Sequence, residues 1–133
     1  MNNTEPLRIT NDDILSVQEE LIKREPIFHR LEWGTTRTDF ENMTDVAFWE
    51  VGASGHRYSR EFVWSVLEER YKNPSEDSWE AEDFYCQEIA PNNYLLTYKL
   101  HQGERVTQRS TLWRHSNGYW KIVYHQGTIV EKG

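Results

Sequence analysis

The strongest β-hairpin signal in the chain is the dipeptide Asn117-Gly118. It separates two segments, 105–114 and 119–127, that are predicted to be strands. Asn-Gly is a preferred sequence for a two-residue hairpin loop, because both loop residues adopt positive φ there. A loop of this length pairs Ser116 with Tyr119, so the two segments are predicted to be neighbouring antiparallel strands.

Two further strand segments, 79–90 and 94–101, come before this hairpin. If Gln102-Gly103 is a second two-residue loop, Leu96 pairs with Arg109. Both loops then assign the same residues to the face that is covered by the rest of the chain. That predicted covered face consists of Tyr94, Leu96, Tyr98, Leu100, Arg109, Thr111, Trp113, Ile122, Tyr124 and Gln126.

The opposite face of the same strands is expected to be an outer, partly apolar surface. By this register Ser110, Leu112, Val123 and His125 belong to it. We expect this outer face to meet another subunit, so the protein is predicted to be a homodimer.

Helical patterns fill the first half of the chain. Thr10 or Asn11 would cap a first helix whose hydrophobic residues repeat at helical spacing. Glu25 and His29 share the hydrophobic side and are four residues apart, so their side chains can meet. Pro26 either kinks this helix or begins a second one.

Two more helices and one strand complete the prediction. A short helix is expected over 36–43, and Ser59 would cap another that ends at Asn73-Pro74. Between them, 46–52 is predicted to be a strand that carries Glu50, with Val46 and Phe48 on the same side. Helices followed by an antiparallel meander define an α+β fold.

Length and composition favour one soluble, cytoplasmic domain over residues 1–133, with 1–11 expected to be flexible. The net charge of −7 argues against nucleic acid and anionic membranes as partners. The lone Cys86 excludes an internal disulfide, and no metal-binding motif is present. We therefore expect neither a metal nor another cofactor.

A carboxylate in a hydrophobic strand needs a partner, because glutamate is rarely buried alone. Arg109 on the covered face would pair with Glu50 or Glu25. The predicted pocket is lined by Glu25, His29, Glu50, Tyr98, Arg109, Trp113, Tyr124 and Gln126. Three interpretations stay open: a structural ion-pair network, a site that binds a ligand without chemistry, and a site of general acid–base catalysis.

Several segments resemble a bacterial family of unknown function within the SnoaL-like, nuclear-transport-factor-2-like superfamily. They are 24–30, 48–55 with 58–60, 94–98, 109–114 and 120–128. The resemblance implies a cystatin-like α+β cone, in which a curved antiparallel sheet wraps around the N-terminal helices and leaves a cavity at its wide end. It also implies dimers formed through the outer face of the sheet.

The superfamily includes ketosteroid isomerase, polyketide cyclases and scytalone dehydratase beside many proteins that are not enzymes. The isomerase's catalytic residues do not carry over to definite positions here. We expect the chain to bind a small organic molecule, an anion if the ligand reaches Arg109. Any catalysis would be cofactor-independent isomerisation, cyclisation or dehydration, with Glu50 or His29 as the base and Arg109 or Tyr98 stabilising an oxyanion. The alternative is a dimeric protein-interaction module whose polar cavity is structural.

Overall fold

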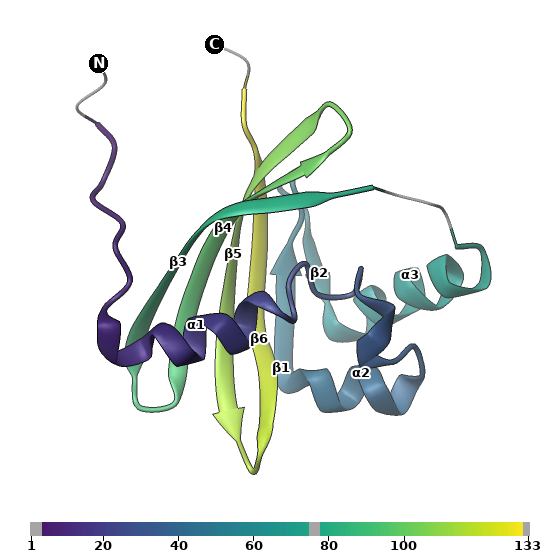
Figure 1. Cartoon of the computed structure of the whole chain (residues 1–133). Coiled ribbons are helices and arrows are strands. Elements are labelled where there is room, and N and C mark those ends of the chain that lie inside the picture. The colour runs from purple at the N-terminus through teal and green to yellow at the C-terminus, as the bar shows by residue number, and fades with distance from the viewer. Residues whose placement is uncertain (1–3, 75–77, 132–133) are drawn as a thin grey trace.

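A single six-stranded sheet forms the frame of the computed structural model, which describes residues 4–74 and 78–131 (Figure 1). The strands are β1 (Thr44–Val51), β2 (Arg57–Ser59), β3 (Glu80–Ala90), β4 (Asn93–Gln102), β5 (Arg105–Ser116) and β6 (Tyr119–Ile129). Their order in the sheet is β2-β1-β6-β5-β4-β3. The last four strands form the predicted antiparallel meander, and β1 joins β6 in parallel, so the sheet as a whole is mixed.

The helices precede the meander and pack against the curved sheet. They are the 3-10 turns η1 (Asp12–Ile14) and η2 (Leu31–Trp33) and the α-helices α1 (Leu15–Ile22), α2 (Arg37–Met43) and α3 (Arg60–Lys72). In Figure 1, α1 crosses the face of the sheet, and α2 and α3 lie beside β1. This arrangement confirms the predicted α+β fold.

Local capping explains where two helices begin. The hydroxyl of Thr36 accepts from the N–H of Asp39, whose side chain accepts from the N–H of Thr36 in return, which makes a capping box for α2. The hydroxyl of Ser59 accepts from the N–H of Phe62 and so caps α3, as predicted.

The first helix is shorter than predicted. It ends at Ile22, and the chain then turns through a cis peptide bond between Glu25 and Pro26. Phe28 in this turn has a φ of 71°. Glu25 and His29 therefore belong to a non-helical turn, and the helical spacing expected to bring them together does not apply.

The N-terminal segment before η1 contacts β3. Arg8 forms an ion pair with Asp83 at 2.8 Å. The hydroxyl of Thr10 accepts from the backbone N–H of Cys86 at 3.1 Å. Residues 1–3 lie outside the described part of the chain.

The hairpin loops decide which side chains share a face. Asn117 and Gly118 have φ values of 51° and 82°, and Ser116 pairs with Tyr119, which confirms the prediction. The other loop starts one residue later than predicted, because Gln102 pairs with Arg105 and Tyr98 therefore pairs with Arg109. This moves the register by two residues, and an even shift leaves every side chain on its predicted face.

A β-bulge in β6 does change the faces. Trp113 pairs with Ile122, but Leu112 pairs with Tyr124, so Val123 is an extra residue on β6. Beyond the bulge Thr111 pairs with His125. The predicted positions of Tyr124, Gln126 and His125 are therefore wrong.

After this correction His125 lies on the covered face and is buried. Tyr124 and Gln126 lie on the outer face, where the Tyr124 hydroxyl donates to the Gln126 amide oxygen at 2.6 Å. The Tyr124 ring packs against Trp49 of β1, with ring centroids 4.7 Å apart.

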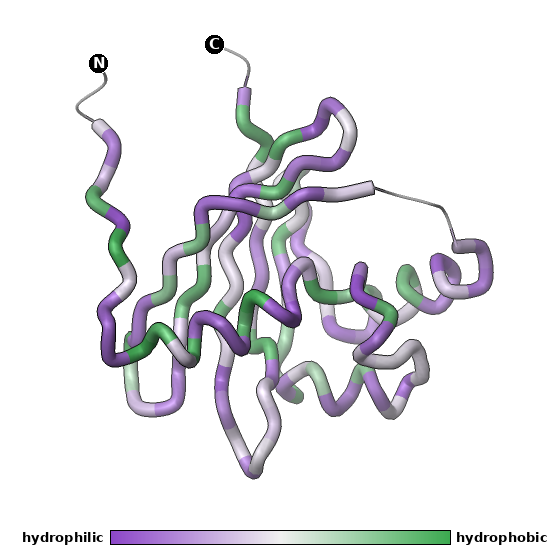
Figure 2. Tube along the Cα trace, in the orientation of Figure 1, coloured by the Kyte–Doolittle hydropathy of each residue, from purple (hydrophilic) through white to green (hydrophobic). Residues whose placement is uncertain are grey.

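The hydrophobic core fills the space between the helices and the covered face. Its members include Leu21, Phe40, Phe48, Leu67, Leu96 and Trp113. Figure 2 shows hydrophobic and hydrophilic residues interspersed along the strands, as expected for strands with one face covered. Among the described residues, none of the helices has the length and apolar character needed to cross a membrane.

Candidate functional site

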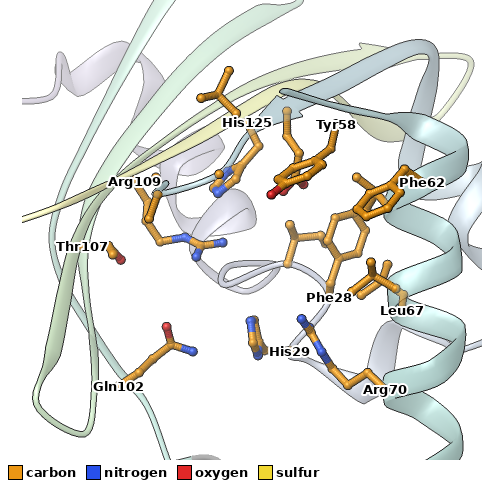
Figure 3. A pocket seen from close by; sticks show the side chains of 18 of the residues that line it. Phe28, His29, Tyr58, Phe62, Leu67, Arg70, Gln102, Thr107, Arg109 and His125 are labelled. Atoms are coloured by element: carbon orange, nitrogen blue, oxygen red, sulfur yellow. The ribbon is translucent and has the colours of Figure 1, made fainter. Parts of the chain in front are cut away.

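A cavity of about 590 Å³ lies between α3 and the covered face of the sheet (Figure 3). Its lining comprises Ile27, Phe28, His29, Glu50, Val51, Gly52, Ala53, Tyr58, Phe62, Val63, Val66, Leu67, Arg70, Gln102, Arg105, Thr107, Arg109, His125 and Gly127. A volume of this size falls in the range of small-molecule sites.

The two walls of the cavity differ in polarity. On α3, Phe62, Val63, Val66 and Leu67 present hydrophobic side chains along nearly two turns. The opposite wall, built by β4, β5 and β6, presents charged and polar groups that include Gln102, Thr107, Arg109 and His125. Figure 3 shows Phe62 and Leu67 of α3 on one side of the cavity, and Gln102, Thr107 and Arg109 on the other.

A buried hydrogen-bond network fixes Arg109. Its Nε donates to the Tyr98 hydroxyl at 3.1 Å, and that hydroxyl donates to Glu25 Oε1 at 2.9 Å. Tyr98 and Glu25 are both buried. Burial and the negative charge of Glu25 raise the pKa of Tyr98 well above its ordinary value, so Tyr98 is a neutral phenol that relays a fixed geometry to Arg109.

Glu25 is satisfied within the protein. Its carboxylate also accepts from Trp113 Nε1 at 3.1 Å and from the backbone N–H of Ile27 at 3.0 Å. With the Tyr98 hydroxyl this makes three donors to one fully buried carboxylate. Such a group is tolerated in a core because hydrogen bonds compensate its lost hydration.

Glu50 is in a different situation. It lies on β1 and lines the cavity, and its pKa is raised by burial, an effect that the positive charges of Arg109 and Arg70 oppose. None of the described residues donates a hydrogen bond to its carboxylate. Glu50 is thus a carboxyl group facing the cavity beside two arginines, with its ionised form disfavoured by desolvation.

His125 is a neutral imidazole in the cavity wall. Its Nδ1 lies 2.9 Å from the hydroxyl of Thr111, its pairing partner on β5. Burial, followed by the positive charges of Arg109 and His29, holds the pKa of His125 well below its ordinary value. At neutral pH it therefore adds a hydrogen-bonding group to the wall, and no charge.

Three arginines line the cavity, namely Arg70, Arg105 and Arg109. The arginine–carboxylate ion pairs within the described part of the chain involve other arginines instead: Arg8, Arg24, Arg30, Arg37 and Arg114. The cavity arginines therefore have no carboxylate partner among the residues that the structure describes.

The predicted pocket residues fall into three groups. His29, Glu50 and Arg109 line the cavity as predicted. Glu25, Tyr98 and Trp113 do not line it, because they form the buried network behind Arg109. Tyr124 and Gln126 do not line it either, because the bulge in β6 turns them to the outer face.

The predicted pairing of Arg109 with Glu25 or Glu50 also needs correction. The Tyr98 hydroxyl lies between Arg109 and Glu25, and Glu50 influences Arg109 through charge, without an ion pair among the described residues. Val46, expected beside Glu50 and Phe48, is 84% exposed, because the register of β1 against β6 shifts between Thr44 and Trp49.

Sequence reasoning missed several residues of the cavity. His125 was misplaced by one bulge, and the run Ile122-Val123-Tyr124, which interrupts the alternation, is the signal that could have revealed it. Arg70 lies on the α3 side that faces the cavity, and Thr107 and Gln102 lie on β5 and β4. The sequence positions of Arg70 and Gln102 gave no indication of a shared site, whereas Thr107 lies two residues before Arg109 and so on the same face of its strand.

Comparison with solved structures identifies the class of fold. A nuclear-transport-factor-2-like (NTF2-like) protein from Cytophaga hutchinsonii is similar with a TM-score of 0.66 and 11% identity, over 91% of this chain and 100% of that one. A protein with a cystatin-like fold from Caulobacter vibrioides is similar with a TM-score of 0.66 and 16% identity, over 86% and 91% of the two chains. The chain therefore has the NTF2-like, cystatin-like fold.

A candidate ketosteroid isomerase from Parabacteroides distasonis has the same fold, with a TM-score of 0.64 and 17% identity over 93% of this chain and 96% of that one. The sequence matches no protein-family model, and no curated protein matches it. At these identities the similarity defines the fold and leaves the function to the site itself.

Proposed function

We propose that the protein binds a small organic acid in the cavity between α3 and the sheet. The observation that carries this proposal is the set of cavity arginines, Arg70, Arg105 and Arg109, which form no ion pair with a described carboxylate. Guanidinium groups suit carboxylate ligands because their donors match both oxygens of the acid.

Charge and polarity support the same ligand class. The protein carries a net charge of −7, yet its cavity contributes three arginines against the single acidic residue Glu50. A positive site within an acidic molecule concentrates anions locally. The hydrophobic wall of α3 would cover the hydrocarbon part of the ligand, while Arg109 binds its acidic group.

The network behind Arg109 makes this residue the anchor of the site. Its Nε is held by the Tyr98 hydroxyl, which is itself held by Glu25. The remaining guanidinium nitrogens are directed toward the cavity in Figure 3. A preorganised donor loses little conformational entropy when a ligand binds, which favours affinity.

Thermal denaturation with benzoate tests the proposal. A ligand at one hundred times its Kd adds about 2.7 kcal/mol to the free energy of unfolding, which is worth roughly 10 °C in a domain of this size. We expect the wild type to have a higher Tm with benzoate than without it. The Tm of the Arg109→Gln variant is expected to be the same with and without benzoate. Arg57→Gln is the matched control, because Arg57 is exposed on β2 and does not line the cavity.

The proposal fails if benzoate and a wider panel of aromatic and aliphatic monocarboxylates stabilise neither the wild type nor Arg57→Gln. It also fails if Arg109→Gln is stabilised as strongly as the wild type, because the acid would then bind elsewhere.

A second candidate function is proton transfer on the bound acid. Glu50 favours it, because a carboxyl group with a raised pKa that faces a cavity beside Arg109 is suited to act as a general base. Arg109 would stabilise the enolate that forms, and His29, which also lines the cavity, is the alternative base. Tyr98, whose hydroxyl is occupied by Glu25 and Arg109, would act through Arg109.

Exchange of phenylpyruvate methylene protons with D₂O, followed by NMR, tests this function. We expect the wild type to accelerate the exchange relative to buffer. The acceleration by Glu50→Gln is expected to be about 10²–10⁴-fold smaller than that by the wild type. Exchange at the buffer rate with wild-type protein would leave binding as the function of the site.

We also propose that the outer face of the sheet mediates homodimerisation. Trp49 is 43% exposed there and packs on Tyr124, next to Leu112 on β5. Aromatic residues on an exposed sheet face are typical of the centre of protein interfaces. The corrected register removes His125 from this surface and adds the aromatic ring of Tyr124 together with the Gln126 amide.

A further inference from the structure

The cavity holds positive groups on both of its walls. Arg109 belongs to β5, and Arg70 belongs to α3, which forms the opposite wall. Figure 3 shows both guanidinium groups extending into the same space, with the His29 ring near Arg70. An acidic group bound by Arg109 would therefore leave a second cation facing the ligand from the other side.

Charge counting indicates how much negative charge the ligand carries. The cavity lining contains three arginines and one glutamate, so its formal charge is 3 − 1 = +2 when His29 and His125 are neutral. A monocarboxylate would neutralise half of this charge. A cation that is partly removed from water and has no counter-ion is costly, so a ligand with two negative charges complements the cavity better.

Among the described residues, no carboxylate forms an ion pair with Arg70, Arg105 or Arg109. Arg70 lies in the last turn of α3 with Glu68 and Glu69 as its chain neighbours, yet Glu69 pairs with Lys72. Both Arg70 and Arg109 act electrostatically on Glu50, which places them around one region of the cavity. Two acidic groups on a short ligand could thus each contact one arginine.

We propose that the natural ligand is a dicarboxylic acid, with one carboxylate bound by Arg109 on the sheet and the other by Arg70 on α3. This inference rests on the proposed function, since it assigns the ligand class of the same site. Its hydrocarbon part lies against Val66 and Leu67, which precede Arg70 on the cavity side of α3. Arg105 is exposed and adds positive charge to the cavity lining, which draws the dianion in.

Matched pairs of ligands isolate the second carboxylate. Phthalate, isophthalate, glutarate and adipate are each compared with their own monomethyl ester, which has nearly the same shape and one charge fewer. Isothermal titration calorimetry at low salt gives the Kd of each compound for the wild type. A charge-assisted hydrogen bond at a half-exposed site is expected to make the best-fitting diacid about tenfold tighter than its ester.

The variants assign that advantage to one residue. In Arg70→Gln the diacid and its ester are expected to bind equally, at about the Kd of the ester for the wild type. Arg109→Gln is expected to lose both compounds. Arg57→Gln removes the same charge outside the cavity and is expected to keep the wild-type ratio, which controls for long-range attraction.

Salt provides an independent readout. The ratio between diacid and ester is expected to fall as NaCl rises from 0.02 to 0.5 M, because screening weakens the contact at half-exposed Arg70. The monoester, bound by Arg109 alone, is expected to change less.

The outcomes separate this inference from the proposed function. If the monoesters and benzoate bind but no diacid binds more tightly than its ester, the proposal of a dicarboxylic ligand is overturned. The proposal of acid binding then stands. If a diacid binds more tightly and Arg70→Gln keeps that advantage, the assignment of Arg70 is overturned. If no acid binds to the wild type, both proposals are overturned together.

Discussion

Two threonines on one strand show how the site differs from the core at the scale of single residues. Thr107 and Thr111 both lie on the covered face of β5 and are both buried. The Thr111 hydroxyl is hydrogen-bonded to His125, whereas the Thr107 hydroxyl has no partner among the described residues. Thr107 lines the cavity, and its oxygen is directed inward in Figure 3.

Replacing each of these threonines by valine gives opposite predictions. Thr107→Val removes an unsatisfied hydroxyl at constant shape and is expected to raise the free energy of unfolding by about 1 kcal/mol. Thr111→Val leaves His125 Nδ1 without this hydrogen-bond partner and is expected to lower the free energy of unfolding by about 1–2 kcal/mol. Urea denaturation of both variants measures the difference, and the gain in β propensity is common to the two.

A destabilised Thr107→Val would show that its hydroxyl is satisfied in solution. If it is stabilised, the native threonine is retained at a cost to stability, which is typical of a residue that serves a ligand.

Glu50 makes stability depend on pH. Its folded pKa is raised above the ordinary value of 4.5, so its contribution to stability is fully present below pH 4.5 and is lost as the pH rises through the folded pKa. Glu50→Gln has no charge to desolvate. We expect this variant to match the wild type near pH 4 and to exceed it at pH 8, by about 1.4 kcal/mol for each unit by which the pKa is raised.

Chemical denaturation of both proteins between pH 4 and pH 8 measures this dependence. A variant that is less stable than the wild type at pH 8 would contradict it, because the attraction of Arg109 and Arg70 would then outweigh the burial of the carboxylate.

At the scale of elements, the β5–β6 hairpin determines which residues reach the cavity. Its loop requires positive φ at Asn117 and Gly118, and the bulge at Val123 then turns His125 inward. One loop and one extra residue thus bring His125 beside Thr111 and bring Tyr124 beside Trp49.

Substituting alanine for glycine tests the contribution of the β5–β6 loop to stability. Gly118→Ala is expected to lower the free energy of unfolding by about 1–2 kcal/mol, because φ is +82° there and a side chain is strained in that region. Gly127→Ala on β6 is the matched control, since Gly127 does not have positive φ and a Cβ would meet no atom within 4 Å. Equal losses in thermal denaturation would indicate that strand packing, and not the loop, sets the cost.

For the whole molecule, the proposed dimer is the main prediction. Light scattering at tens of micromolar protein is expected to give the mass of a dimer for the wild type and of a monomer for Trp49→Glu. Leu31→Glu is the control, because Leu31 in η2 is an exposed hydrophobic residue away from the sheet. A wild-type monomer at this concentration would contradict the prediction.

The sequence by itself determined the elements and much of their pairing. Turn chemistry acts locally, so Asn117-Gly118 was enough to predict the last hairpin. The cap at Ser59 and the stop at Asn73-Pro74 were enough to place α3. The predicted β4–β5 loop was misplaced by one residue, but the residues of β4 and β5 still lie on their predicted faces, since an even shift of register preserves the faces.

Only the tertiary structure decided which polar groups meet. Whether Glu25 pairs with Arg109 depends on Tyr98 lying between them, and the three residues are brought together by packing of segments distant in the chain. Arg70 and Thr107 reach one cavity for the same reason. Periodicity gives the side of an element on which a residue lies, but the contacts across a core depend on how elements pack and on single bulges that the local sequence marks only weakly.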